Sequence, residues 1–285
     1  MENLETLAFS RRVDRLLEPW AGKPGPGVTI GVARDGAMLL HRNAGLASIE
    51  LNVPISPATT FRIASVSKQF TCAAILMLAA EGKLDVQGDA RAHLPELPDT
   101  GHRVTIAHLM HNSAGVRDMF EILRLGGSDL DQPVTPAQIT AGIHRQRALN
   151  FAPGSRYLYS NSNFWLLGLI VERLSGMPLP AFLDARIFAP LGMSMTRMTP
   201  STLEPAPGLA TGYFPVGAGW QRAAHAYPLG GEGGLVSSVI DMARPAVTRA
   251  GCRSARIAAR GPKATAGCGR ASRRSSCARR SIIWW

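Results

Sequence analysis

The feature that most constrains the fold is an apolar helix that directly follows the stretch from Ser65 to Lys68. Downstream of Lys68, apolar residues recur at helical spacing and also fill the other faces as far as Ala80, so this helix is predicted to be buried on nearly every side. Gly82 supplies its stop signal. A chain of 285 residues, 46% of them hydrophobic, is long and apolar enough to build a core around such a helix.

Ser65 and Lys68 are candidate catalytic residues because of their place at the start of this helix. Backbone N–H groups there lack helical partners, and the helix dipole favours negative charge. Lys68 lies three residues on, on the same face, and can reach the Ser65 hydroxyl. A serine beside a lysine that is partly screened from water can become an activated nucleophile. The alternative is that Ser65 only caps the helix and that Lys68 is solvated.

Charge divides the chain near residue 243. The net charge is +11, yet residues 1–242 sum to zero, while residues 243–285 hold 11 basic residues and no acidic one. Three of the 4 cysteines also lie in residues 243–285, so residues 1–242 contain one cysteine, Cys72. A single cysteine excludes a disulfide framework or a cysteine metal site within residues 1–242. Residues 243–285 show no period of 2 or 3.6, so they are predicted to be a basic, disordered tail. Their composition is typical of out-of-frame translation of a GC-rich gene.

The first 20 residues show no signal peptide, and no stretch has the length of a membrane span. The sequence as written therefore predicts a cytoplasmic protein, or a periplasmic one if the true start lies upstream.

The N-terminal part is predicted to be the edge of a sheet. Leu4 to Leu17 has helical spacing, and residues 28–33 and 37–44 are typical of strands joined by a turn at Asp35-Gly36. Two antiparallel strands are not stable alone and need further strands or a helix against them.

Residues 83–200 are predicted to be mainly helical. A short helix near residues 105–111 carries His108 and His111 at i and i+3, a spacing that can indicate a metal, but no third ligand stands nearby. No metal site is therefore predicted here. A further helix is predicted from Pro136 to Gln146.

Tyr159 and Asn161 stand on a polar loop just before a strongly apolar helix over residues 164–174. A tyrosine near a lysine can lose its proton more easily and act as a base, and an asparagine can hold a substrate carbonyl or orient the lysine. The alternative is that Tyr159 packs in the core and Asn161 caps the helix. Farther on, a glycine-rich run over residues 230–234 permits close backbone approach and leads into another predicted helix start.

Together these stretches resemble the penicillin-recognising serine hydrolases, a family that includes class C β-lactamases, DD-peptidases, family VIII esterases and D-aminopeptidases. The resemblance covers roughly Gly27 to Ala243, and residues 65–72 and 112–118 are most similar to the D-aminopeptidase branch. The matching pieces are the Ser-Val-Ser-Lys run from Ser65, the Tyr-Ser-Asn run from Tyr159, the stretch Gly231–Ser238, and the flanking stretches His111–Asp118 and Arg186–Met193.

The resemblance implies a β-lactamase/transpeptidase-like fold, in which an α/β domain and an all-α domain enclose the site. Residues 1–82 would begin the α/β domain and include the nucleophile helix, 83–200 would form the helical domain, and 201–242 would return to the α/β domain. It also implies the roles of the site residues: Ser65 as acylated nucleophile, Lys68 and Tyr159 as bases, Asn161 as the group that binds the substrate amide, and no cofactor.

The sequence departs from the family in one respect. We find no Lys/His-x-Gly motif after the glycine-rich run, so the antiparallel sheet is expected to be incomplete at its C-terminal side, as in a truncated or frameshifted chain. The predicted function is a serine hydrolase acting on small amide, ester or peptide substrates. The alternatives are a catalytically dead remnant or a nucleic-acid binder with a basic tail. The tail lacks the interleaved aromatic residues of a stacking surface, which disfavours nucleic acid, and the oligomeric state is not indicated.

Overall fold

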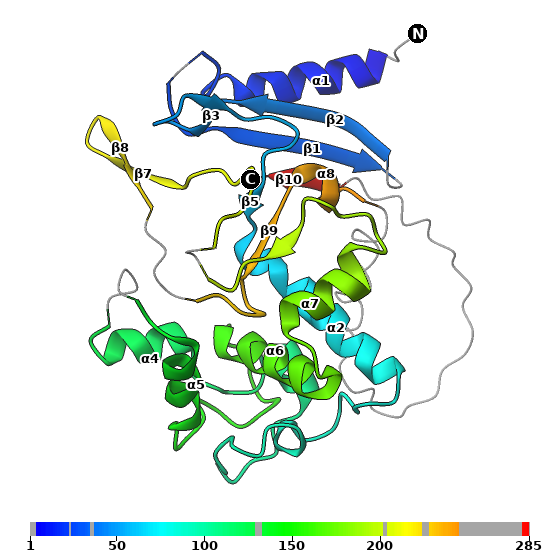
Figure 1. Ribbon diagram of the computed structural model, residues 1–285, viewed down its shortest axis with the longest axis vertical. Helices are drawn as coiled ribbons and strands as arrows, with labels where there is room; N and C mark the ends of the chain where they lie inside the picture. Colours follow the sequence, from blue (N-terminus) through cyan, green and yellow to red (C-terminus); the bar gives the residue numbers. More distant parts are fainter. Residues whose placement is uncertain are drawn as a thin grey trace.

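The computed structural model describes residues 4–22, 24–34, 37–128, 133–201, 204–223 and 228–244, together with the backbone of 281–284 (Figure 1). These residues form small antiparallel sheets on one side and a layer of helices on the other. The predicted combination of an α/β part with an all-α part is therefore present. The exact domain boundaries stay a prediction.

The N-terminal helix α1 (Leu4–Leu17) packs on an antiparallel pair of strands, β1 (Val28–Arg34) and β2 (Ala37–Ala44). Val13 and Leu17 are buried against β1, whose side chains are buried along nearly its whole length. The turn predicted at residues 35–36 lies outside the described residues, but Arg34 stands opposite Ala37, as a tight hairpin requires.

One part of the predicted disordered tail is a strand instead. β10 (Ser281–Trp284) pairs antiparallel with β1 and gives the order β10-β1-β2. The physical reason is that β1 has a second edge of backbone N–H and C=O groups to satisfy, and that Ile282 and Ile283 favour extended backbone. Apart from these four residues, Ala243 and Arg244, the tail lies outside the described residues.

A second sheet has the order β5-β9-β6, from β5 (Phe61–Arg62), β9 (Leu235–Ser237) and β6 (Arg197–Met198). β9 is fully buried and leads into α8 (Val239–Met242), the helix whose start was predicted after the glycine-rich run, and Ser238 caps it. Two hairpins complete the described strands: β3 (Leu46–Ser48) with β4 (Val53–Pro54), and β7 (Tyr213–Val216) with β8 (Gly219–Arg222).

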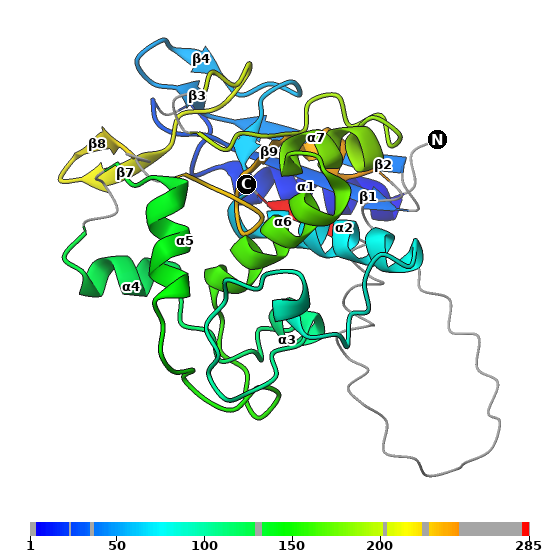
Figure 2. The ribbon, with the colours of Figure 1, turned by 60° about the horizontal axis from the view of Figure 1, so that its bottom comes forward.

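The helical layer is built around two helices that contact each other, α2 (Lys68–Ala80) and α6 (Asn161–Ser175). Both were predicted from apolar spacing, and both are buried on several faces. The remaining helices gather around them (Figure 2): α3 (Ile106–Met110), α4 (Met119–Leu125), α5 (Pro136–His144) and α7 (Leu179–Leu183), with the short turns η1 (Ala64–Ser67), η2 (Ala90–Ala92) and η3 (Asp184–Phe188).

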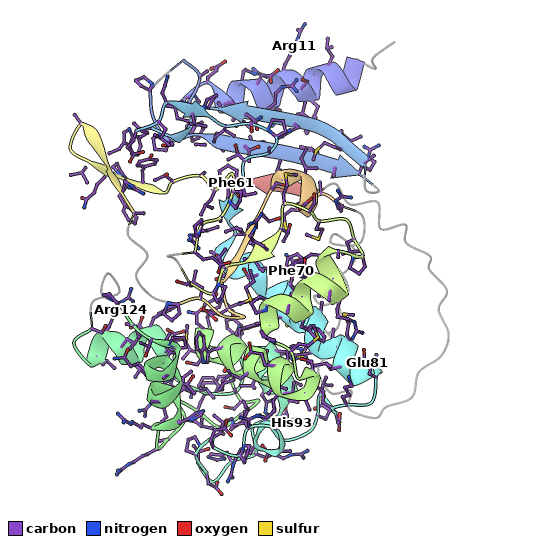
Figure 3. All side chains as sticks on the ribbon, viewed as in Figure 1. Arg11, Phe61, Phe70, Glu81, His93 and Arg124 are labelled. Atoms are coloured by element: carbon purple, nitrogen blue, oxygen red, sulfur yellow. The ribbon has the colours of Figure 1, made fainter. Side chains whose placement is uncertain are left out.

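One large apolar cluster runs through this layer. Phe70 of α2, labelled in Figure 3, meets the ring of Phe188 edge-on, with the ring centroids 5.5 Å apart and the planes at 74°. Ile75 and Leu78 of α2 and Leu166 and Ile170 of α6 are fully buried in the same cluster. Helix α2 is thereby fixed by packing along its length, which holds its first turn in place.

Within the described ranges, no single helix is both long and apolar enough to cross a membrane. Helix α6 and the segment Leu179–Phe188 reach that length and apolarity only when taken together, across a bend of 77°.

Candidate active site

Ser65 lies in the 3₁₀ turn η1, which runs directly into α2, and its side chain is exposed. The preceding residue, Ala64, has φ +43°, a left-handed conformation that a residue with a Cβ adopts at an energetic cost. Leu235 of strand β9 forms hydrogen bonds with residues at both ends of this turn. The Ile63 N–H donates to the Leu235 carbonyl at 3.0 Å, and the Leu235 N–H donates to Ser67 Oγ at 3.2 Å.

The Lys68 side chain is only 8% exposed, and its three ammonium donors are all used. Nζ donates to Ser65 Oγ at 3.1 Å, to Asn161 Oδ1 at 2.9 Å and to the Glu232 backbone carbonyl at 2.7 Å. The ammonium also stands 4.8 Å from the centroid of the Tyr159 ring. These contacts confine Nζ to one position beside the serine hydroxyl.

Tyr159 contacts the same hydroxyl. Its Oη lies 2.5 Å from Ser65 Oγ, and the side chain is 42% exposed. The serine oxygen is therefore within hydrogen-bond distance of two side chains, the buried Lys68 and the solvent-facing Tyr159.

The loop that carries Tyr159 is held by Asn112, a buried residue with φ +54°. Asn112 Oδ1 accepts from the Ser160 N–H at 3.1 Å and from Asn163 Nδ2 at 2.9 Å, and its carbonyl accepts from the Leu158 N–H at 2.9 Å. Tyr159 is thus fixed between two anchored neighbours. This explains how an exposed tyrosine on a loop keeps one position over the serine.

Asn161 is the first residue of α6, and its side chain bridges two charged residues. Its Oδ1 faces Lys68, while its backbone N–H and its Nδ2 both donate to Asp118 Oδ2, at 2.5 and 2.9 Å. The predicted alternative, in which Asn161 caps the helix, does not fit this geometry, because Ser160 occupies the N-cap position.

The glycine-rich run borders the site, because the Glu232 carbonyl within it accepts from Lys68 Nζ. Thr71 Oγ1 donates to the Gly231 carbonyl at 2.7 Å, which ties the run to α2. A Cβ on Gly231 would lie 2.6 Å from the Phe164 carbonyl oxygen, so only glycine allows this approach.

Glu232 lies within this run and is buried, with 2% of its surface exposed. Its Oε1 accepts from the Gly230 N–H at 2.8 Å, and its Oε2 has no hydrogen-bond partner. Burial raises the pKa of Glu232 to about 7, against the lowering effects of the Gly230 N–H and the Lys68 charge.

His108, considered above for a metal, has a structural contact. Its Nδ1 accepts from the Thr105 N–H at 3.2 Å, and the Thr105 hydroxyl accepts from the His108 N–H at 3.0 Å, which forms a capping box at the start of α3. Among the residues that the structure describes, no group of three or more His, Cys, Asp or Glu side chains could hold a metal ion.

The structure brings together all four residues predicted for the site: Ser65, Lys68, Tyr159 and Asn161. Sequence reasoning gave no role to Asn112, Asp118 or Glu232. The first two belong to a stretch that carried the family resemblance, and this was the one signal for them. Glu232 lies in Gly231–Ser238, another stretch that carried the resemblance, but nothing in that pattern showed its burial beside Lys68.

Comparison with known proteins agrees with this geometry. Residues 13–270 match the family model described as Beta-lactamase. With that much of its length matched, and with a serine, a lysine and a tyrosine converging as described, the chain belongs to the beta-lactamase family. The predicted resemblance and fold class are confirmed.

Individual relatives refine the picture. The chain is 32% identical over 239 residues to a D-aminopeptidase of Gluconobacter oxydans. The aligned region covers 82% of this chain and 44% of the relative. The chain therefore spans less than half the length of that enzyme.

Two solved structures are similar in fold. A D-amino acid amidase from Ochrobactrum anthropi SV3, solved with L-phenylalanine amide, is 25% identical with a TM-score of 0.66, and the match covers 82% of this chain and 65% of the amidase. EstCE1, a hydrolase with promiscuous acyltransferase activity, is 22% identical with a TM-score of 0.71, and the match covers 84% of this chain and 71% of EstCE1.

Proposed function

We propose that this chain is a serine hydrolase that forms an acyl-enzyme at Ser65 with small amide or ester substrates. One observation carries the proposal: Ser65 Oγ lies 3.1 Å from Lys68 Nζ and 2.5 Å from Tyr159 Oη. A hydroxyl held between a lysine and a tyrosine at the start of a helix has the arrangement of an activated nucleophile, because either side chain can accept the serine proton once it has lost its own.

In the proposed reaction, Ser65 Oγ attacks the substrate carbonyl carbon while its proton passes to the Lys68–Tyr159 pair. The carbonyl oxygen becomes an oxyanion, which the Ser65 backbone N–H at the start of the helix would stabilise. Collapse of this intermediate breaks the bond to the leaving group, and Tyr159 returns the proton to the departing amine or alcohol. Water then hydrolyses the Ser65 ester and restores the hydroxyl.

The substrates we favour are amides or short peptides of D-amino acids. The support is that a relative at 32% identity is named a D-aminopeptidase and that a similar structure is a D-amino acid amidase. Asn161 uses one N–H of its amide group on Asp118. We assign the second N–H to the carbonyl group of the substrate.

The test is intact-protein and peptide mass spectrometry after incubation with a fluorophosphonate, which forms a stable bond to an activated serine and releases fluoride. We expect one adduct, on the peptide that contains Ser65, and its loss in Ser65→Ala at an unchanged circular dichroism spectrum. An adduct on Ser67 or Ser113, or none on the folded wild-type protein, would overturn the proposal.

A further inference from the structure

We infer that Asp118 is a positioning residue that holds the Asn161 amide so that its oxygen faces Lys68. The inference rests on the proposed function for its kinetic test and on the described contacts for its geometry. Asp118 stands just before α4, 43 positions from Asn161 in the sequence.

The contact between the two residues fixes which way the amide points. Asp118 Oδ2 accepts two N–H groups of Asn161, one from the backbone at 2.5 Å and one from the side chain at 2.9 Å. With Nδ2 held on the carboxylate, Oδ1 lies at the opposite end and meets Lys68 Nζ at 2.9 Å. A flipped amide would aim N–H groups at an ammonium, where donor would face donor.

The Asp118 carboxylate is itself held in place by hydrogen bonds from the first turn of α4 to its other oxygen. Oδ1 accepts from the Phe120 N–H at 2.9 Å and from the Glu121 N–H at 3.3 Å, and so caps α4. Four N–H groups thus converge on one side chain, two on each oxygen. Only a carboxylate offers acceptors on both sides. An asparagine at position 118 would turn its NH₂ group toward N–H groups on one side or the other.

The hydrogen bonds form one continuous line from carboxylate to nucleophile. Asp118 accepts from Asn161, Asn161 accepts from Lys68, and Lys68 donates to Ser65 Oγ. Successive hydrogen bonds of this kind polarise one another. The Asp118 carboxylate therefore makes Asn161 Oδ1 a stronger acceptor for the Lys68 ammonium. Loss of Asp118 would therefore release Asn161 first and let Nζ drift from the serine.

The kinetic test measures the second-order rate of Ser65 labelling by the fluorophosphonate. Asp118→Ser keeps a good N-cap for α4 but is too short to reach Asn161, so it separates the two roles. We expect labelling to slow about 100-fold in Asp118→Ser and Asp118→Asn, the size expected for a misplacement of about 1 Å at a reacting group. Wild-type rates in Asp118→Ser would overturn the inference, because the residue would then act only as a cap.

A double-mutant cycle shows whether the effect passes through Asn161. In an Asn161→Ala background, we expect Asp118→Ser to change the labelling rate less than about 3-fold, since its partner is already gone. Losses that multiply in the double variant would contradict the inference. Asp89→Ser, at the N-cap of η2, is the matched control for loss of an aspartate cap, and should label at the wild-type rate.

A readout that does not depend on acylation uses the side-chain amide of Asn161. Its two ¹H–¹⁵N signals are assigned by their absence in Asn161→Ala. We expect one of them to lie downfield and exchange slowly in the wild type, and to lose both properties in Asp118→Ser but not in Asp89→Ser. Unchanged signals in Asp118→Ser would overturn the inference. If wild-type Ser65 is not labelled, the proposed function fails, and this measurement still decides the role of Asp118.

Discussion

Glu232→Gln should make the stability of the protein less dependent on pH. Glu232 is 2% exposed, and burial raises its pKa from 4.5 to about 7, with the Asp118 charge adding to the rise and the Lys68 charge opposing it. The folded protein therefore binds a proton at Glu232 more tightly than the unfolded chain does. That contribution to stability is fully present below about pH 4.5 and is lost as the pH rises through about 7.

The magnitude follows from the same values. A pKa that rises from 4.5 to about 7 on folding corresponds to roughly 3 kcal/mol lost between acidic and alkaline pH. Glutamine keeps the oxygen that accepts the Gly230 N–H and carries no charge at any pH. Relative to the wild type, Glu232→Gln should therefore gain up to roughly 3 kcal/mol of unfolding free energy between pH 4 and pH 8.5.

The assay is urea unfolding of both proteins at several pH values between 4 and 8.5, followed by circular dichroism. The difference should persist at raised salt, because a buried charge is screened far less than exposed ones. Parallel stability curves for the two proteins across this range would refute the reasoning, since Glu232 would then ionise alike in the folded and unfolded states.

Three further predictions concern the site. Lys68→Arg keeps the charge but cannot give up its proton, so fluorophosphonate labelling should be lost as fully as in Lys68→Ala; labelling that survives in the arginine variant would reduce Lys68 to an electrostatic role. The wild-type chain should hydrolyse nitrocefin, p-nitrophenyl esters and D-alanine p-nitroanilide poorly. The family resemblance implies that the strand with the Lys/His-x-Gly motif supplies a second oxyanion donor, and loss of one such donor costs about 2.7–4 kcal/mol; robust turnover that disappears in Ser65→Ala would contradict this. Gly231→Ala should slow labelling and destabilise the fold by about 1–3 kcal/mol because its Cβ would lie 2.6 Å from the Phe164 carbonyl, whereas Gly233→Ala, whose Cβ would meet nothing closer than 3.8 Å, is the matched control and should behave like the wild type.

Local patterns in the sequence were sufficient to predict most of the elements. The apolar spacing after Lys68 and after Asn161 predicted α2 and α6, and the turn residues after Arg34 predicted the β1–β2 hairpin. These features depend on neighbours a few positions apart, which is the range over which periodicity and turn chemistry act.

The supports of the site could not be predicted in the same way. Asp118 meets a partner 43 positions away, and the Glu232 carbonyl meets one 164 positions away. Neither contact follows from a helical or strand period, because each exists only after α2, α6 and the glycine-rich run have packed together. The pairing of β10 with β1 was missed for a related reason: the composition of residues 243–285 as a whole concealed a four-residue strand at their end.

The apolar residues of α1 and of the β1–β2 hairpin form a cluster separate from the one that contains α2 and α6. Two clusters of unequal size define two cooperative units that can open with different free energies. Native-state hydrogen exchange should therefore find amides of β1 and β2 exchanging through a partial opening that leaves α2 and α6 protected. Since Ser65, Lys68 and Tyr159 are all anchored to the larger unit, Ser65 should stay reactive at urea concentrations that already release the N-terminal hairpin.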